Sequence, residues 1–310
     1  MVKYITTAVA LKCSSSTPFT RRIYRGLGNM LGGKRRRQGK MPLYYAERLK
    51  RMLRLTREHQ IVRDGDRILE LGTGWLHWEA LTLRLFFDVE AVLYDVWDNR
   101  QLGGMKNYLG QLQGMLNADF GLSPAELKRA VGLIDRILQV ASFDELYKML
   151  GFEYHVESSG SLSRYVDSSF QLVVSAGVLE HVNRGALPLL IPETRRVLKP
   201  GGWALHSIDT SDHLAHYAKS VSRKFYLSIP EWKWKLLCEN EVQYINRLQR
   251  GEWLQLFKGS GFEIIEVDGQ TVDISKLKLS EKYKNMDRRE LECTVVRLAM
   301  KNNSTASARK

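Results

Sequence analysis

The chain has 310 residues, of which 44% are hydrophobic and 26% charged, with 24 Gly and only 7 Pro. This composition excludes a collagen-like, low-complexity or mostly disordered protein, and the length is sufficient for one large core. The formal net charge is +13, a value that invites a nucleic-acid or membrane-surface function.

The excess of positive charge lies at the two ends of the chain. Residues 1–46 contain ten Lys and Arg and no acid, and residues 301–310 contain three Lys and Arg and no acid. Residues 47–300 carry 34 basic and 34 acidic side chains. Because this body is neutral, a nucleic-acid partner is not expected. We therefore divide the chain into a basic N-terminal extension (1–46), a main domain (47–300) and a basic tail (301–310).

The acid-free extension raises the question of location. Its charges, together with apolar residues such as Phe19, Ile23 and Leu27, suggest peripheral docking to anionic lipid at the inner membrane, with a solvated or self-packed segment as the alternative. A transit peptide is disfavoured by the Gly-rich run Pro18–Arg37. No stretch approaches about 18 consecutive apolar residues, so we expect a cytoplasmic protein without a transmembrane segment. Three widely spaced cysteines form neither a disulfide framework nor a metal-ligand pattern, and no metal site is predicted.

The first predicted elements form a strand–loop–helix–strand unit. Residues 41–62 have apolar positions at helical spacing among Lys and Arg. Asp64–Gly74 is typical of a turn, a short apolar strand and a Gly-rich loop, Trp78–Phe87 of a helix, and Glu90–Val96 of a strand that ends near an acid. Such a unit begins a parallel α/β sheet.

Two longer segments interrupt this alternation, and we interpret them as helical insertions. The first, at about residues 100–150, has Ser123 and Ser142 at N-cap positions, and Glu145 completes a capping-box pattern. The second, at about 212–260, is predicted to form a helical lid. Further expected elements are a helix near Ala186–Leu198 and strands at Phe152–Glu157, Phe170–Ser175, Trp203–Ser207, Gly261–Val267 and Leu291–Met300.

The loop after the first predicted strand carries the chemistry. Glu70–Gly74 lies at the carboxyl end of that strand, where open α/β sheets bind ligands, and glycines there let the backbone approach a ligand and donate N–H groups to it. The next strand ends near Asp95, whose carboxylate can accept both ribose hydroxyls of an adenosine cofactor. A dinucleotide fingerprint would need a third Gly at His77, and an acid at Glu70 would repel a pyrophosphate but suit a cation.

Four blocks in order carry a specific resemblance. They are ILELGTG (Ile68–Gly74), AVLYDV (Ala91–Val96), FQLVVSAGVLEHV (Phe170–Val182) and RVLKPGGWALHS (Arg196–Ser207). In this order and spacing they resemble the class I S-adenosylmethionine-dependent methyltransferases, in particular the type 11-like members. The resemblance implies an α/β fold with a Rossmann-like, seven-stranded, mostly parallel sheet whose last strand is antiparallel, and the two C-terminal strands fit it.

The resemblance also implies a bound S-adenosylmethionine. Glu70 and the backbone of Gly72–Gly74 would face its amino-acid part, and Asp95 would face its ribose. Val96 would flank its adenine, and Ser175–Gly177 would flank its methionine side. The implied cofactor-binding residues are Glu70, Gly72, Thr73, Gly74, Asp95, Val96, Ser175, Ala176 and Gly177. One departure is Leu76, which stands where a third glycine is frequently seen.

Histidines and acids near the ends of the fourth and fifth strands are the candidate catalytic residues. His206 or His213 with Asp209 could act as a general base and its orienting carboxylate for a hydroxyl acceptor. The same three side chains have suitable types for a divalent metal but no recognised spacing. In a structural alternative, Asp212 and His213 cap and fix the inserted segment. His181 could line the pocket or hold the loop after its strand.

The favoured function is methyl transfer from S-adenosylmethionine to a hydroxyl or amine of a small polar acceptor. The combination of DTSDHLAHY (Asp209–Tyr217), a Trp-containing helix and the segment Tyr244–Phe262 resembles bacterial methyltransferases associated with surface-polysaccharide synthesis, which implies a sugar or glycan acceptor. The aromatic residues of the second insertion could stack on such a ligand or form the insertion's own core. The alternatives are a nucleic-acid methyltransferase, although the chain lacks an Asn-Pro-Pro-Tyr-like tetrapeptide and a Pro-Cys nucleophile, and a non-catalytic cofactor-binding module.

Overall fold

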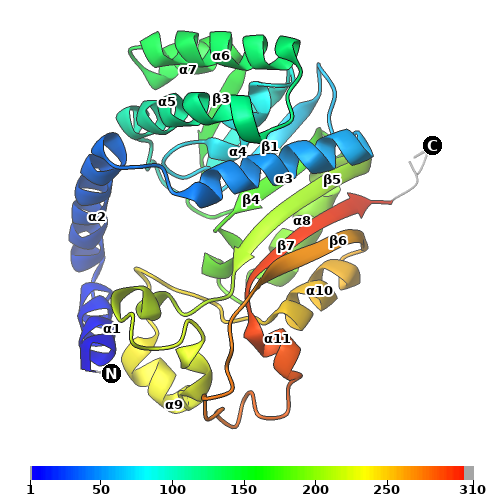
Figure 1. The fold of residues 1–310 in the computed structure, drawn as a ribbon. Helices are drawn as coiled ribbons and strands as arrows, with labels where there is room; N and C mark the ends of the chain where they lie inside the picture. Colours follow the sequence, from blue (N-terminus) through cyan, green and yellow to red (C-terminus); the bar gives the residue numbers. More distant parts are fainter. Residues whose placement is uncertain (1, 304–310) are drawn as a thin grey trace. The chain divides into compact units, whose positions relative to one another are not determined.

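The computed structural model describes residues 2–303, apart from the side chains of residues 117–119. Its strands form a seven-stranded sheet in the order β3-β2-β1-β4-β5-β7-β6 (Figure 1). The sheet is mostly parallel with an antiparallel last strand, which confirms the predicted α/β fold. The strands are β1 (Arg67–Leu71), β2 (Glu90–Asp95), β3 (Phe152–Val156), β4 (Phe170–Ala176), β5 (Leu198–Asp209), β6 (Phe262–Thr271) and β7 (Cys293–Asn302).

Helices connect and precede these strands. They are α1 (Val2–Ser14), α2 (Pro18–Gln38), α3 (Leu43–His59), α4 (Trp78–Arg84), α5 (Leu102–Asp119), α6 (Pro124–Gln139), α7 (Phe143–Leu150), α8 (Leu187–Val197), α9 (Glu231–Lys233), α10 (Arg250–Gly259) and α11 (Arg288–Glu292). Short 3₁₀ turns are η1 (Leu179–His181), η2 (His213–Tyr217) and η3 (Phe225–Ser228), and η4 (Trp234–Cys238) is a π turn. Within the described part of the chain, no helix is both long and apolar enough to span a bilayer.

The chain divides into two compact units. The first unit consists of residues 1–28, 176–192 and 206–300, and the second of residues 29–175, 193–205 and 301–310. One boundary between the units lies within α2, between residues 28 and 29. No boundary lies at residue 46, where the predicted extension ends. Of the predicted basic tail, residues 304–310 lie outside the described residues.

The second unit holds the predicted strand–loop–helix–strand unit and the first helical insertion. β1 pairs in parallel with β2 on one side and β4 on the other, and all but its first residue are buried. In the insertion, α6 begins with a complete capping box between Ser123 and Glu126. Ser142 caps α7 by accepting from the backbone N–H of Glu145, whose own carboxylate accepts from Ala141. Capping residues therefore set both helix starts, as expected.

The first unit has a hydrophobic core that includes the N-terminal helix. Tyr4, Ala8 and Leu11 of α1 are buried in this core with residues such as Tyr226 and Trp234. Residues 2–14 and 18–38, part of the predicted basic extension, are thus helical, and α1 is packed rather than solvated. Residues 212–249 form only short 3₁₀, α and π turns, so the second insertion is less regular than predicted.

Candidate active site

We call residues 70–77, which include the end of β1 and the turn after it, the glycine loop. After Leu71, Gly72 and Gly74 take positive φ values of 65° and 58°. Residues with a Cβ rarely adopt this left-handed conformation, so both glycines have a conformational reason. The loop ends at His77, which also has a positive φ, of 52°, and directly precedes α4.

The amide N–H groups of the glycine loop are used within the fold. Gly72 and Thr73 donate to the carbonyl oxygen of Tyr94 at 2.8 and 3.1 Å, and Gly74 donates to Asp95 Oδ2 at 2.8 Å. In the structure these three N–H groups donate to residues of the neighbouring strand β2, and the expected contact of the loop amides with a ligand stays a prediction. With these three amides engaged, the carbonyl oxygens of the loop suit a cationic ligand better than a phosphate.

Asp95 lies at the end of β2, as predicted, and is 6% exposed. Its Oδ2 accepts from Gly74 and its Oδ1 accepts from the N–H of Val96 at 2.7 Å. Burial raises the pKa of this carboxyl above its usual value, although these N–H groups act in the opposite direction. The backbone N–H of Trp97 also donates to this carboxylate, and because an ionised carboxylate has about four lone-pair sites, acceptor capacity remains for the ribose.

Glu70 is buried beneath the glycine loop. Its Oε2 accepts from the backbone N–H of Ala80 at 2.8 Å, near the start of α4. Burial and the neighbouring Glu79 raise its pKa well above the usual value, and Glu79 in turn pairs with Arg48 at 2.8 Å. The structure thus gives this carboxylate a contact that holds α4 to the sheet, which differs from the expectation that it faces the cofactor.

His77 occupies the position where a dinucleotide fingerprint has its third glycine. The ring is fully buried, with Nδ1 2.6 Å from Thr73 Oγ1 and Nε2 2.8 Å from the hydroxyl of Tyr147. Burial and the nearby Arg100 lower its pKa to about 3. The imidazole fills the space beside α4, which agrees with the exclusion of a dinucleotide site from the sequence.

The second half of α2 supports the glycine loop from outside. Trp75 donates its indole N–H to Asn29 Oδ1 at 3.1 Å, and the guanidinium of Arg36 lies 3.7 Å above the Trp75 ring. Arg36 also donates to Gln101 Oε1 at 2.7 Å. Sequence reasoning missed these residues because it assigned them to a detached extension, and no motif marks them.

The remaining predicted cofactor residues lie at the ends of β2 and β4. Val96 is half-buried directly after Asp95, and Ser175 is buried near the end of β4. Ala176 is the last residue of β4, and Gly177 follows with φ of 69° and donates its N–H to the carbonyl of Ser207 at 2.9 Å. Their contacts with adenine and methionine stay predictions.

In the first unit, Glu180, His181, Asp209 and His213 form what we call the histidine cluster. One candidate ligand atom from each of Glu180, His181 and His213 lies within 4.8 Å of the others. Asp209 Oδ2 is 3.6 Å from His213 Nε2, and the rings of His181 and His213 have centroids 5.1 Å apart. The turns η1 and η2, which follow β4 and β5, supply three of these side chains.

Electrostatics within the cluster is dominated by burial and by Asp209. Burial lowers the pKa of His213, but the adjacent Asp209 outweighs it and the net pKa is raised. Burial and the charge of Asp209 raise the pKa of Glu180 to about 8. Although the ring of His181 reaches solvent, enclosure by neighbouring segments and the nearby His213 lower its pKa to about 4.

His206 is predicted to be a base candidate, but the structure does not bring it into the cluster. Its ring is 2% exposed and stacks on Phe257 of α10, with centroids 5.4 Å apart and an interplanar angle of 18°. Burial lowers its pKa to about 3. The side chain of Asp212 instead caps η2 by accepting from the N–H of Leu214, as the structural alternative expected.

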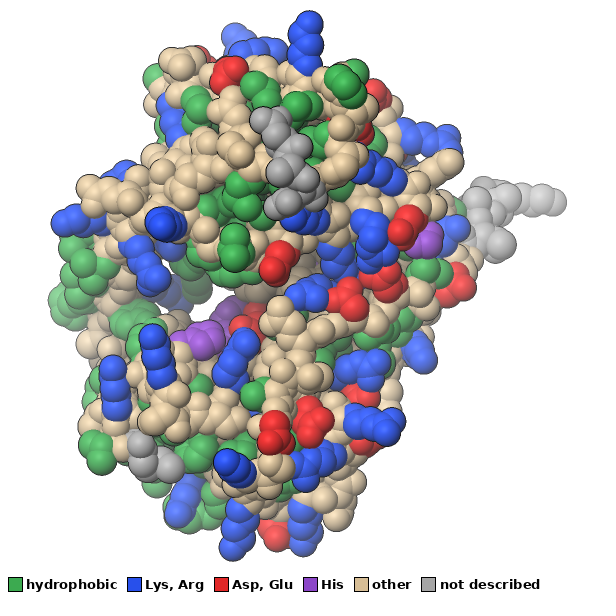
Figure 2. Space-filling view, viewed as in Figure 1, with side chains coloured by type: hydrophobic (Ala, Val, Ile, Leu, Met, Phe, Trp, Pro, Cys, Tyr) green, Lys and Arg blue, Asp and Glu red, His purple; other side chains and the backbone are tan. Residues whose placement is uncertain are grey.

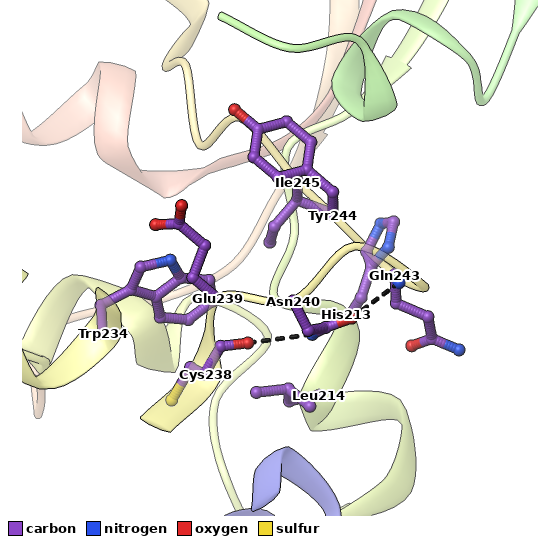
Figure 3. A pocket seen from close by; sticks show the side chains of 9 residues that line it. All are labelled: His213, Leu214, Trp234, Cys238, Glu239, Asn240, Gln243, Tyr244 and Ile245. Carbon is purple, nitrogen blue, oxygen red and sulfur yellow. Dashed lines mark hydrogen bonds between the residues drawn. The ribbon is translucent and has the colours of Figure 1, made fainter. Parts of the chain in front are cut away.

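A pocket adjoins the histidine cluster in the first unit (Figure 3). His213 belongs to both, and residues from η2 to the segment after η4 form the walls. Apolar and aromatic groups alternate with amides and a carboxylate. The lining residues are His213, Leu214, Trp234, Cys238, Glu239, Asn240, Gln243, Tyr244 and Ile245.

Comparisons with known proteins give one family. A family model described as a methyltransferase domain matches residues 36–267. No curated protein sequence matches the chain. Among solved structures, a SAM-dependent methyltransferase from Methanosarcina mazei is 17% identical with a TM-score of 0.44, over 79% of this chain and 95% of that chain. Phosphoethanolamine N-methyltransferase 2 of Haemonchus contortus, in complex with S-adenosyl-L-methionine, is 15% identical with a TM-score of 0.46, over 81% and 52%.

Proposed function

The chain belongs to this methyltransferase family, and from that premise we propose that it transfers a methyl group from S-adenosylmethionine to a hydroxyl or amine of a small polar acceptor. S-adenosylmethionine is the cofactor expected of the family. The glycine loop carries the proposal, because its amides are used internally while Asp95 retains acceptor positions. That arrangement suits a cationic adenosine cofactor better than a dinucleotide.

The proposed cofactor contacts follow the predicted residues. Asp95 accepts the ribose hydroxyls, and carbonyl oxygens of Gly72–Gly74 accept from the ammonium group of the methionine part. Val96 flanks the adenine, and Ser175–Gly177 the methionine side chain. Glu70 acts through α4 and the loop rather than by direct contact, because its Oε2 accepts from Ala80.

The proposed reaction is an in-line displacement. A lone pair of the acceptor attacks the methyl carbon, the carbon–sulfur bond breaks, and S-adenosylhomocysteine leaves as a neutral thioether. A hydroxyl acceptor must also lose its proton, and we assign this step to His181, Asp209 and His213 of the histidine cluster. His206 is omitted from the catalytic set, because its ring is buried against Phe257.

A sugar or glycan intermediate is the proposed acceptor class. Gln243 and Tyr244, which line the pocket beside the cluster, are half-buried, whereas Trp234 is 3% exposed and belongs to the core of the first unit. Aromatic faces with adjacent amides suit a polyhydroxylated ring. Elsewhere in the second insertion, Tyr226 and Trp253 are buried and support its core, whereas Tyr217 and Trp232 are 41% and 64% exposed.

Replacement of Asp95 tests the cofactor assignment. In Asp95→Asn the side chain keeps one oxygen acceptor, so a hydrogen bond to a ribose hydroxyl or to the loop is lost. Such a bond to a charged group contributes about 1.5–3 kcal/mol, which corresponds to a roughly 10–100-fold loss of S-adenosylmethionine affinity by calorimetry. Asp98→Asn, at an exposed acid that pairs with Arg100, is the matched control.

The outcomes separate the candidate functions. Unchanged affinity in Asp95→Asn would show that the cofactor site is elsewhere. Labelled methyl transfer into fractionated lysate then tests the reaction, and cofactor binding without transfer to any fraction would favour the non-catalytic module. Methylation confined to DNA or RNA fractions would favour the nucleic-acid alternative.

We also propose that α2 contacts an anionic membrane surface. Phe19, Ile23 and Leu27 recur every fourth residue and are 70%, 46% and 51% exposed, and Met30 and Leu31 continue this face at 61% and 64%. Figure 2 shows hydrophobic side chains at the surface over α2, with Lys and Arg side chains near them. An exposed apolar face on an acid-free, Arg-rich helix has the chemistry of an interfacial helix.

Vesicle sedimentation tests this contact. The parent protein is expected to sediment with phosphatidylglycerol-containing vesicles but not with pure phosphatidylcholine, and a Phe19→Ser, Ile23→Ser, Leu27→Ser variant is expected to stay in solution. Leu189→Ser, at an equally exposed leucine of α8, is the control. Equal sedimentation of the triple variant and the parent ends the proposal.

A further inference from the structure

The histidine cluster has the composition and spacing of a metal site. Glu180 and His181 are adjacent on η1, His213 begins η2, and their ligand atoms all lie within 4.8 Å of one another. We propose that these three side chains bind a divalent transition-metal ion. The set differs from the metal alternative considered from the sequence, which combined His206, Asp209 and His213.

The hydrogen bond of His181 leaves the correct nitrogen for a metal. Its Nδ1 is 2.7 Å from the backbone carbonyl oxygen of Tyr244. A carbonyl can only accept, so Nδ1 carries the hydrogen and Nε2 keeps its lone pair. Metal-binding histidines are commonly oriented by such a bond from the other ring nitrogen to a carbonyl. The structure therefore fixes both the tautomer and the direction of this ligand.

Glu180 supplies a buried carboxylate with one oxygen that no hydrogen bond from the described part of the chain satisfies. The side chain is 3% exposed, and its Oε2 has no hydrogen-bond partner among the described residues. Burying a polar oxygen without a partner is unfavourable, and a second carboxylate, Asp209, lies beside the same His213. A divalent cation bound by Glu180 would satisfy the oxygen and stabilise the ionised form of this carboxylate beside Asp209.

The ligand types indicate the class of metal. Two imidazoles and one carboxylate suit Zn²⁺, Mn²⁺ or Fe²⁺, whereas Mg²⁺ and Ca²⁺ prefer oxygen ligands alone. Zinc–ligand bonds of about 2.0–2.2 Å place neighbouring ligand atoms roughly 3.4 Å apart in a tetrahedral site, so binding would draw the side chains slightly inward. Asp209 would then accept a hydrogen bond in the outer shell or become a fourth ligand.

Three protein ligands leave a coordination position open. On the proposed methyl-transfer function, on which this step rests, an acceptor hydroxyl would occupy that position and lose its proton more readily. Glu180, His181 and His213 would hold the metal, and Asp209 beside them would accept the hydroxyl proton, so His213 would be a ligand rather than the base. The metal would also fix the acceptor oxygen in place for attack on the methyl carbon.

Cobalt is the probe, because Co²⁺ reports its ligands by visible absorption. Untagged full-length protein, freed of metal with a chelator, is titrated with Co²⁺ and, by calorimetry, with Zn²⁺. We expect one equivalent to bind and Glu180→Gln and His213→Gln to weaken binding at least 10-fold. His216→Gln is the matched control, because its ring stacks on His213 at 5.5 Å but contributes no ligand to the group.

The proposal would be overturned if Co²⁺ gave no absorption bands. It would also be overturned if the parent and both ligand variants bound Co²⁺ equally, with circular dichroism showing each variant to be folded. These readouts do not depend on methyl transfer, so failure of the proposed function leaves them intact. Transfer that persists after chelation, in a protein that binds Co²⁺, would overturn the catalytic role of the metal and return His213 to the role of base.

Discussion

Replacing the buried His206 tests whether this ring is a packing residue or a base. The imidazole is 2% exposed, stacks on Phe257 and has its pKa lowered to about 3 by burial. His206→Leu keeps an apolar side chain of similar size in the same core position. Because the ring is not assigned a contact with acceptor or cofactor, we expect methyl transfer at neutral pH to change by only a few-fold.

The acid sensitivity of folding is expected to change much more. In the unfolded chain a histidine takes up its proton near pH 6.5, whereas the folded state resists protonation until about pH 3. As the pH falls between these values, the unfolded state binds one more proton and the free energy of unfolding decreases by about 1.4 kcal/mol per pH unit. Between pH 7.5 and pH 5, His206 therefore removes about 2 kcal/mol, a loss that the Leu variant does not suffer.

Urea unfolding at pH 7.5 and pH 5, followed by circular dichroism, measures this difference. The gap in free energy of unfolding between the parent and His206→Leu should change by about 2 kcal/mol, in favour of the variant, from pH 7.5 to pH 5. His59→Leu, at an exposed ring that stacks on Trp203, is the matched control for replacement of an imidazole at the surface. Constant gaps for both variants would refute the burial argument, and a hundredfold loss of turnover in folded His206→Leu would restore a catalytic role.

Three further predictions concern packing, capping and the cofactor loop. Tyr4→Phe removes the hydroxyl that donates to buried Asp212 at 2.8 Å, so the free energy of unfolding should fall by about 1.5–3 kcal/mol in urea titrations. Tyr283→Phe should be nearly neutral, because that hydroxyl has no partner among the residues described. Ser123→Ala breaks the capping box of α6 and should lower the free energy of unfolding by about 1 kcal/mol in the same assay. Because both residues belong to one capping box, the double variant Ser123→Ala, Glu126→Ala should lose less than the sum of the two single variants. Arg36→Ala removes the cation from the Trp75 ring and should weaken S-adenosylmethionine binding in calorimetry, whereas exposed Arg35→Ala should not; equal affinities would separate α2 from the cofactor site.

Most of the sheet could be predicted because its strands have local signals. β1 and β2 are short apolar runs followed by a Gly-rich loop or an acid, and capping serines mark α6 and α7. Residues 212–249 lack such signals. Their apolar and aromatic residues do not recur with the strand period of 2 or the helix period of 3.6 over a long window. The short turns in this segment are therefore determined by tertiary contacts rather than by local propensity.

The conformation of the glycine loop was predictable from its residue types, whereas its hydrogen bonds were not. Gly72 and Gly74 have the positive φ that their residue type suggests, but the use of their amides depends on pairing with Tyr94 in another strand. Glu180 was missed because a lone acid before a histidine matches no metal spacing. Only the fold brings it to His213, more than thirty residues further along the chain.

The N-terminal helix shows what net charge alone leaves out. Tyr4, Ala8 and Leu11 are spaced by four and three residues, which is the period of a buried helix face, and all three are in the core of the first unit. Net charge describes the solvent-facing residues and says nothing of this face. Because Tyr4 also donates to Asp212, which caps η2 next to His213, deletion of residues 1–40 would disturb the histidine cluster as well as the basic segment. Loss of activity in such a truncation would therefore not demonstrate a membrane role, and only substitutions on the exposed face of α2 can separate the two effects.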